Sequence, residues 1–237
     1  MKPTKALVFD VFGTLVDWRT SIAREVGETL AARGLRVDPE AFADAWRGEY
    51  QPAMEEIRSG RKPFCKLDEL HRRNLDRVLK VFELDAVDEA TRVQLNHAWH
   101  RLDPWPDVNN ALTRLRHRFL VAPCSNGNIA LMADLARHNH WHWDAILGAE
   151  LARDYKPKPI VYTSAAAAFD CDPEQVVMVA AHSSDLAAAA AAGLKTAFIA
   201  RPDEHGPNRG EKAPSVQVDF SALGLGDLAD RLGFGDA

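Results

Sequence analysis

The sequence predicts an α/β protein: a doubly wound parallel sheet forming a Rossmann-like core, with a helical cap domain inserted after the first strand. Short apolar runs alternate with helical patterns, and one long stretch contains no convincing strand. The expected strands span residues 6–9, 119–122, 176–181 and 196–199, and the expected core helices span 107–117, 128–138, 158–169 and 184–192. Such alternation is typical of a parallel sheet with helices on both faces. Because the runs are continuously apolar, we expect both faces of each strand to be buried.

The stretch without strands, residues 18–101, is expected to be helical. Apolar side chains recur every three to four residues from Phe42 to Ile57, which places them in one stripe on a helix. Two further helices are expected over 67–82 and 90–99, and two prolines then interrupt the chain before the α/β pattern resumes. We therefore expect a core domain of residues 1–16 and 102–237 and a cap domain of residues 17–101.

Charge and composition exclude several classes of protein. The 237 residues carry 29 Lys and Arg against 34 Asp and Glu, a net charge of −5, whereas a nucleic-acid binder normally has a basic excess. No run of ~18 apolar residues is present, so we expect no membrane span. The opening residues lack the apolar region of a signal peptide, and the three cysteines are widely spaced. We expect a cytoplasmic protein with reduced thiols.

Three histidines between His138 and His142 raise the question of a metal site. Histidines two residues apart lie about 200° apart on a helix, so their rings face in different directions. No acidic or cysteine ligand accompanies them in this run. We expect a surface or packing role for these histidines and no metal.

Polar residues follow the predicted strands at the point where each strand ends. Asp10 follows the first strand, the pair Ser125-Asn126 follows the second, and Lys156 and Asp185 lie in later segments of the same kind. The carboxyl ends of parallel strands meet at one edge of the sheet, where open α/β sheets bind their ligands. The sequence therefore predicts a crevice that contains two carboxylates, a lysine and a hydroxyl–amide pair.

In motif order, this constellation resembles the haloacid dehalogenase superfamily over essentially the whole chain. Phosphatases of that superfamily carry Asp-x-Asp in the first motif, in which the second acid protonates the leaving alkoxide. Here the segment reads Asp10-Val11-Phe12, so the nucleophile is present and the general acid is missing. A halide leaves as a stable anion and needs no proton. The segment therefore looks like the L-2-haloacid dehalogenase branch.

Further segments are similar to that branch. Ala45-Trp46-Arg47 resembles the cap segment that supplies the halide-binding arginine, and Ser125 and Asn126 match the family's Ser-Asn pair. The segment from Tyr155 to Tyr162 matches the family's lysine-plus-tyrosine segment, which makes Lys156 and Tyr162 functional residues.

The fourth motif departs from the family pattern. The family commonly has Ser-Ser-Asn-x-x-Asp where this chain has Ala180-Ala181-His182-Ser183-Ser184-Asp185. A serine hydroxyl is thus replaced by Ala180, and an amide by the imidazole of His182. Because the imidazole titrates close to neutral pH, His182 beside a catalytic carboxylate has an evident use. The alternative is a polar residue that merely satisfies its hydrogen bonds at the strand end.

The resemblance implies a reaction in two steps. Asp10 attacks the halogen-bearing carbon and forms an aspartyl ester, and water then attacks the carbonyl carbon of that ester. Asp185 is expected to orient or deprotonate this water, with help from His182, while Lys156 balances the two carboxylates and stabilises the oxyanion. Thr14 is expected to hold Asp10 in its attacking rotamer.

The remaining site residues are expected to bind the substrate. Ser125, with backbone N–H groups of the Val11-Phe12 turn, is expected to bind the substrate carboxylate. Arg47 and Asn126 are expected to receive the halide, with His182 as an additional donor where that halide is fluoride. Aromatic side chains of the cap, Trp46 among them and with Phe64 as a further candidate, are expected to exclude water and narrow the pocket.

These expectations define the substrates and partners. We expect short 2-haloacids, fluoroacetate among them, to be converted to 2-hydroxy acids and halide without a metal or other cofactor. The resemblance also implies a homodimer. Two alternatives stay open: a Mg²⁺-dependent phosphatase of the same superfamily, and a non-catalytic binding protein on the same fold.

Overall fold

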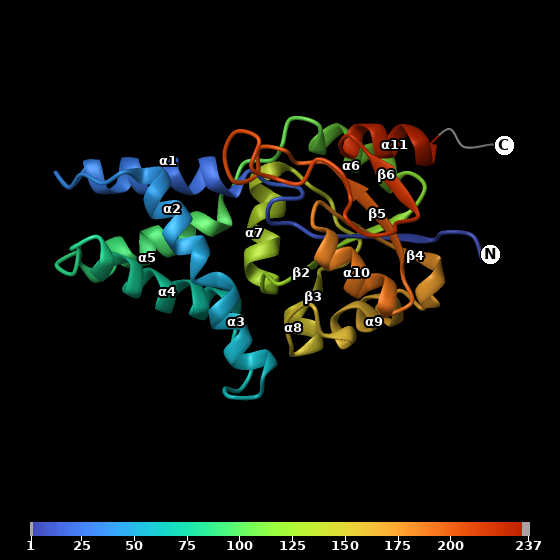
Figure 1. Ribbon diagram of the computed structural model, residues 1–237, viewed down its shortest axis with the longest axis horizontal. Helices are drawn as coiled ribbons and strands as arrows, with labels where there is room; N and C mark the ends of the chain where they lie inside the picture. Colours follow the sequence, from blue (N-terminus) through green and yellow to red (C-terminus); the bar gives the residue numbers. More distant parts are fainter. Residues whose placement is uncertain (1, 234–237) are drawn as a thin grey trace.

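The core is a six-stranded parallel sheet that lies between two layers of helices (Figure 1). The computed structural model describes residues 2–233. The strand order is β3-β2-β1-β4-β5-β6, which places β1 at the centre. The strands are β1 (Ala6–Phe9), β2 (Leu120–Ser125), β3 (Leu147–Gly148), β4 (Val176–Ala180), β5 (Lys195–Ile199) and β6 (Phe220–Ala222).

Alternate residues of the central strands face two separate apolar clusters. Leu7 and Phe9 of β1 belong to a cluster with the helices α6 and α7, whereas Ala6 and Val8 face a second cluster with α9 and α10. The core helices are α6 (Val108–Arg116), α7 (Ile129–Asn139), α8 (Ala149–Ala152), α9 (Pro159–Ala168), α10 (Ser183–Ala191) and α11 (Leu225–Gly233). The expected doubly wound α/β core is confirmed, and so is the double-sided burial of its strands.

The helices between β1 and α6 lie beside the sheet and not on its faces (Figure 1). They are α1 (Trp18–Ala31), α2 (Pro39–Gly48), α3 (Tyr50–Arg58), α4 (Leu67–Val81), α5 (Glu89–Asn96) and the 3₁₀ turn η1 (His97–His100). The insertion after the first strand is therefore helical, as expected. The domain boundaries 1–16, 17–101 and 102–237 stay a prediction.

The apolar stripe from Phe42 to Ile57 lies on two helices and not on one as expected. Helix α2 ends at Gly48, where Glu49 N–H bonds to the Trp46 carbonyl, 3.3 Å away, in a tightened turn. Pro52 in the first turn of α3 is the physical reason. In a continuous helix it has no N–H for the Gly48 carbonyl, and its ring clashes with that carbonyl. No helix within residues 2–233 combines the length and apolar character needed to cross a membrane.

Candidate active site

Asp10 follows β1 directly, and its carboxylate is bound by three side chains. Lys156 Nζ lies 2.8 Å from Oδ1, Thr14 Oγ1 donates to Oδ2 at 2.7 Å, and His182 Nδ1 lies 3.2 Å from Oδ2. Burial opposes ionisation of Asp10, but the positive charges of Lys156 and His182 outweigh it and hold the pKa of Asp10 well below its ordinary value. Asp10 is thus an ionised carboxylate with 6% of its surface exposed.

The turn after Asp10 is fixed from several sides. Gly13 has φ +84°, a left-handed conformation that favours glycine. Thr14 Oγ1 accepts a hydrogen bond from the N–H of Ala181 at 2.9 Å, and its backbone carbonyl accepts one from Arg201 Nε at 2.8 Å. The Thr14 hydroxyl donates its proton to Asp10 and accepts the N–H of Ala181, and these two hydrogen bonds fix its orientation.

Lys156 bridges the two carboxylates of the site. Its Nζ lies 2.5 Å from Oδ2 of Asp185, and the Tyr162 hydroxyl donates to the other oxygen of Asp185 at 2.5 Å. The backbone N–H of Lys156 donates to Oδ1 of Asn126 at 2.9 Å, which ties the lysine segment to the end of β2. Burial lowers the pKa of Lys156, but Asp10 and Asp185 outweigh burial and raise it well above its ordinary value. Lys156 is therefore a buried ammonium group.

His182 is the N-cap residue of α10, and both of its ring nitrogens have partners. Nδ1 faces Asp10, and Nε2 lies 2.8 Å from Oε2 of Glu204. Burial lowers the pKa of His182, but the two carboxylates outweigh burial and raise it to about 10. Contrary to expectation, this geometry leaves no ring nitrogen of His182 free to bind a fluoride.

Arg47 and the aromatic residues around it form the cap side of the site. The Arg47 guanidinium lies 4.0 Å above the ring of Tyr50 and 5.9 Å from that of Phe12. Its NH1 atom is buried without a hydrogen-bond partner within the described part of the chain. Phe12 in turn packs edge-on against Tyr50 and Trp99. A buried guanidinium N–H in an aromatic surrounding is suited to a monovalent anion.

These side chains line one cavity of about 810 Å³ between the insertion and the core. The lining residues are Asp10, Phe12, Arg47, Gly48, Tyr50, Gln51, Glu55, Arg58, Asn126, Lys156, Pro157, Lys158, Tyr162, His182, Ser184, Asp185 and His205. Eight of the expected site residues are among them, and Thr14 reaches the cavity through its bond to Asp10. The structure thus brings together the side chains that the sequence placed at separate strand ends.

Three expected pocket residues do not line this cavity. Ser125 is fully buried, and its Oγ accepts a hydrogen bond from the N–H of Gly127 at 3.0 Å. Trp46 packs edge-on against Trp99 and donates from Nε1 to the His71 carbonyl at 3.0 Å, and Phe64 packs on Tyr155. The direct contacts expected of Ser125, Trp46 and Phe64 therefore have no counterpart in this arrangement.

Sequence reasoning missed Glu204, the partner of His182. Glu204 lies five residues after the end of β5, at the same edge of the sheet as the other site residues. The rule that identified Asp10 and Asp185 also applies to this strand, since Asp185 likewise lies five residues after the end of β4, so the same signal could have found Glu204. Arg58 was missed too; its NH1 donates to the Lys156 carbonyl at 2.7 Å and joins α3 to the core.

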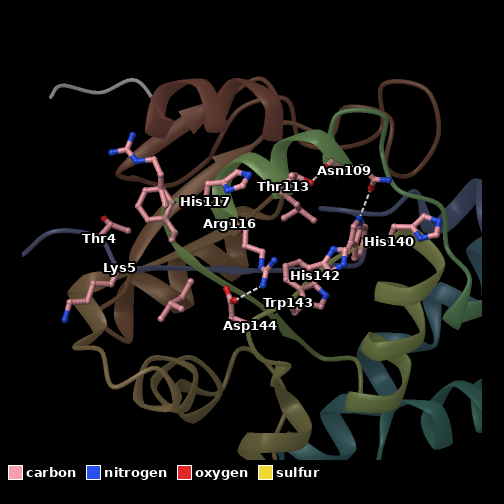
Figure 2. A pocket seen from close by; sticks show the side chains of 15 residues that line it. Thr4, Lys5, Asn109, Thr113, Arg116, His117, His140, His142, Trp143 and Asp144 are labelled. Atoms are coloured by element: carbon pink, nitrogen blue, oxygen red, sulfur yellow. Dashed lines mark hydrogen bonds and ion pairs between the residues drawn. The ribbon is translucent and has the colours of Figure 1, made fainter.

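A second cavity, of about 630 Å³, lies near the start of β1 and β2 (Figure 2). Its lining is largely basic and aromatic, and its one carboxylate, Asp144, pairs with Arg116 at 3.4 Å. Asp144 is engaged by an arginine and has no second acid beside it among the lining residues, whereas around Asp10 a lysine joins two carboxylates. We therefore place the chemistry in the larger cavity.

A family model described as haloacid dehalogenase-like hydrolase matches residues 4–193. The chain belongs to the haloacid dehalogenase-like hydrolases. Among solved structures, a defluorinating L-2-haloacid dehalogenase is 45% identical, with a TM-score of 0.95, and the match covers 97% of this chain and 95% of the other. A second L-2-haloacid dehalogenase is 44% identical, with a TM-score of 0.91 over 97% and 99% of the two chains. Within the haloacid dehalogenase-like hydrolases, the chain thus groups with the L-2-haloacid dehalogenases.

More distant relatives have names of the same kind. Haloacetate dehalogenase H-2 of Moraxella sp. (strain B) is 27% identical, covering 85% of this chain and 88% of its own length. (S)-2-haloacid dehalogenase 1 of Pseudomonas sp. (strain CBS-3) is 29% identical, covering 85% and 86%. A magnesium-bound hydrolase is 14% identical to this chain, with a TM-score of 0.77, and this likeness shows a shared fold alone.

Proposed function

We propose that this protein hydrolyses short L-2-haloacids to 2-hydroxy acids through an ester on Asp10. The observation that carries the proposal is an ionised, buried Asp10 held by Lys156, with the aromatic ring of Phe12 where a phosphatase needs an acid. The names of the relatives support the same reaction.

In the first step a carboxylate oxygen of Asp10 forms a bond to the carbon that carries the halogen, and the halide leaves with the electron pair of the broken bond. Thr14, His182 and Lys156 fix the carboxylate, so little freedom of rotation is lost when the substrate arrives. Phe12 and Tyr50 keep water away from the reacting carbon, which protects the nucleophile from solvation.

In the second step water adds to the carboxyl carbon of Asp10, and the bond from that carbon to the ester oxygen breaks. We assign Asp185 as the group that takes a proton from this water and returns it to the departing 2-hydroxy acid. Lys156 and Tyr162 hold one oxygen of Asp185 each, which leaves each oxygen a further lone pair for the water. Lys156 also balances the negative charge that develops.

The leaving halide is assigned to Arg47 and Asn126. Arg47 provides a buried N–H for which residues 2–233 offer no hydrogen-bond partner. The Asn126 amide accepts from Lys156 through Oδ1, so its Nδ2 group is the end that can donate. Backbone N–H groups of the turn at Val11 and Phe12 are assigned to the substrate carboxylate, while Ser125 supports the neighbouring backbone through Gly127.

We extend the proposal to fluoroacetate. Fluoride is strongly hydrated, so it leaves only where fixed donors replace its hydration shell. Arg47 and Asn126 supply these donors here, without His182. The 45% identical structure named as a defluorinating L-2-haloacid dehalogenase supports this extension. A homodimer and a cytoplasmic location belong to the same proposal; the dimer is tested by analytical ultracentrifugation.

The residues present do not suit the Mg²⁺ site of a phosphatase. The second carboxylate of an Asp-x-Asp pair is replaced by Phe12, which is 2% exposed within an aromatic cluster. The ammonium group of Lys156 already lies between Asp10 and Asp185 and pairs with both carboxylates. A divalent cation between these carboxylates would lie against Nζ, so we derive no step through a metal.

The test is halide release from 2-chloropropionate enantiomers, chloroacetate and fluoroacetate, with and without EDTA. The proposal predicts halide release from L-2-chloropropionate, chloroacetate and fluoroacetate. For each substrate, we expect the same rate with EDTA as without it. Phosphate release from phosphomonoesters that EDTA abolishes would instead identify the Mg²⁺-dependent phosphatase. No turnover of either class would favour a binding protein.

A further inference from the structure

The pair of His182 and Glu204 is placed where the second step of the reaction takes place. Nδ1 of His182 lies 3.2 Å from Oδ2 of Asp10, and Nε2 lies 2.8 Å from Oε2 of Glu204. An ionised carboxylate only accepts hydrogen bonds, so a neutral ring would turn the lone pair of one nitrogen toward a carboxylate oxygen, whereas a doubly protonated ring presents an N–H to both. His182 is thus an imidazolium between two carboxylates.

Glu204 is a buried side chain next to the turn that follows Asp10. It is 2% exposed, and Trp18 Nε1 donates to its Oε1 at 3.2 Å. A Cβ atom at Gly13 would lie 2.0 Å from the same Oε1, so the nucleophile turn accepts this carboxylate only because residue 13 is glycine. A buried carboxylate costs stability unless it is paired. Glu204 has its closest ionic partner in His182.

We propose that Glu204 is a positioning residue for hydrolysis of the ester: it holds His182 as an imidazolium whose Nδ1–H forms, together with the Thr14 hydroxyl, an oxyanion hole on Oδ2 of Asp10. This inference rests on the proposed function and assigns Glu204 a part in it. The role differs from that of Asp185, which handles the proton of the water.

The hydrogen bonds of Asp10 decide which of its oxygens attacks. Oδ1 accepts from Lys156, whereas Oδ2 accepts from Thr14 and also faces Nδ1 of His182 at 3.2 Å. The oxygen with fewer donors retains more of its charge, so Oδ1 forms the bond to the substrate carbon and Oδ2 becomes the ester carbonyl oxygen. The two donors then face the atom on which negative charge develops in the second step.

The second step balances with these assignments. Water adds to the carboxyl carbon of Asp10, its proton goes to Asp185, and the electron pair of the carbonyl bond moves to Oδ2. When that pair returns, the bond from the carboxyl carbon to Oδ1 breaks, and Asp185 gives the proton to Oδ1 of the departing 2-hydroxy acid. The second proton of the water leaves the restored Asp10 for solvent, and the overall products are hydroxy acid, halide and one proton.

The charged groups around His182 determine the effect of pH. Asp10 from the end of β1 and Glu204 from the loop after β5 bind the ring directly, and Asp185 lies on the same helix as His182. Lys156 binds Asp10, while Arg47 and His205 act on Glu204. The two carboxylates in contact outweigh the cations, so the imidazolium persists through neutral pH and is lost at alkaline pH. Removal of the Glu204 charge moves this loss to lower pH.

The experiment separates the two steps in Glu204→Gln, Glu204→Asp and the control Glu211→Gln. Glu211 is a matched carboxylate of the same loop region, bound to Ser183 and not to His182. Rapid mixing with chloroacetate measures the halide burst, and mass spectrometry of quenched samples measures the decay of the ester. In Glu204→Gln we expect an unchanged burst, ester decay slower by about tenfold or more, and an alkaline limb of ester decay at lower pH. Glu204→Asp recovers part of the rate, and Glu211→Gln behaves as wild type.

Several outcomes would overturn the inference. One is equal loss of burst and ester decay in Glu204→Gln, which indicates a merely structural role. Another is unchanged ester decay. If Glu204→Gln does not fold, ¹⁵N NMR of wild-type histidines, with His182→Asn for assignment, takes its place: titration of His182 near pH 6.5 contradicts the inference, and protonation that persists at pH 8 supports it. If wild type releases no halide from any 2-haloacid, the proposed function itself has failed, whatever the charge of His182.

Discussion

Replacing Lys156 by methionine tests the electrostatic design of the site. The Nζ group lies 2.8 Å from Asp10 and 2.5 Å from Asp185, so its loss leaves two buried carboxylates facing each other. Asp10 keeps His182 as a counter-charge, whereas Asp185 keeps, among the side chains of residues 2–233, the hydrogen bond from the Tyr162 hydroxyl. Methionine fills a similar volume to lysine but carries no charge. The effect of Lys156→Met is therefore electrostatic and does not come from an empty cavity.

The expected magnitude follows from these contacts. Removal of one partner from a buried ion pair costs about 3–5 kcal/mol of stability. Loss of the charge that stabilises the transition state lowers kcat by about 10²- to 10³-fold. Lys156 lowers the pKa of Asp10, and Asp10 attacks only when it is ionised, so the acid limb of activity moves to higher pH in the variant.

The assay is halide release from L-2-chloropropionate between pH 4 and pH 9, with thermal unfolding of the same samples. Lys158→Met is the matched control, because Lys158 borders the same cavity two residues further along and does not contact Asp10 or Asp185. We expect the control to stay within about twofold of wild type, as surface substitutions usually do. Wild-type kcat and an unmoved acid limb in Lys156→Met would refute the electrostatic reasoning.

Three further predictions concern other parts of the molecule. Phe12→Asp should abolish most haloacid turnover without creating a phosphatase, because it puts a charge beside the substrate; kcat for both substrate classes measures this. Arg47→Lys should weaken fluoride release more than bromide release, since the more strongly hydrated halide depends more on fixed donors; ion electrodes measure both. Burial lowers the pKa of His100, but Asp68 and Asp134 outweigh burial and raise that pKa. The ion pairs of His100 with these two carboxylates therefore stabilise the fold most below about pH 6.5. This stabilisation is lost as the pH rises through the raised pKa of His100. His100→Asn should therefore lower Tm more at pH 6 than at pH 9.

Each of these predictions has a contrary result. Unchanged haloacid turnover in Phe12→Asp would show that Phe12 does not face the substrate. Equal losses for fluoride and bromide in Arg47→Lys would remove Arg47 from the leaving-group site. A Tm difference that grows with pH in His100→Asn would contradict the sign of the His100 contribution.

The sequence predicted the site well where short strands deliver residues to one edge. Asp10 and Asp185 follow β1 and β4 at once or within a few residues, so the strand assignments sufficed to bring them together. The two residues of β3 and the three of β6 are too short for a periodic signal, and both strands were missed. Tertiary pairing with β2 and β5 fixes them instead.

Contacts between distant loops could not be predicted from the pattern. Glu204 reaches His182 only because the loop after β5 folds back under the turn at Gly13, and no local periodicity encodes that path. The hydroxyl of Ser125 was correctly placed at the strand end, but its direction toward Gly127 depends on backbone geometry beyond the motif. Strand ends thus predicted which residues meet, and packing decided which of them face the cavity.

A single turnover in ¹⁸O-water tests the ester on Asp10 most directly. Enzyme in excess over L-2-chloropropionate is quenched after one turnover, and the peptide that contains Asp10 is analysed by mass spectrometry beside the product. Water attacks the carboxyl carbon of Asp10 in our account, so the label enters Asp10 and the first 2-hydroxy acid carries none. Label in the product of the first turnover, with an unlabelled Asp10, would show that water attacks the substrate carbon directly and would contradict the account.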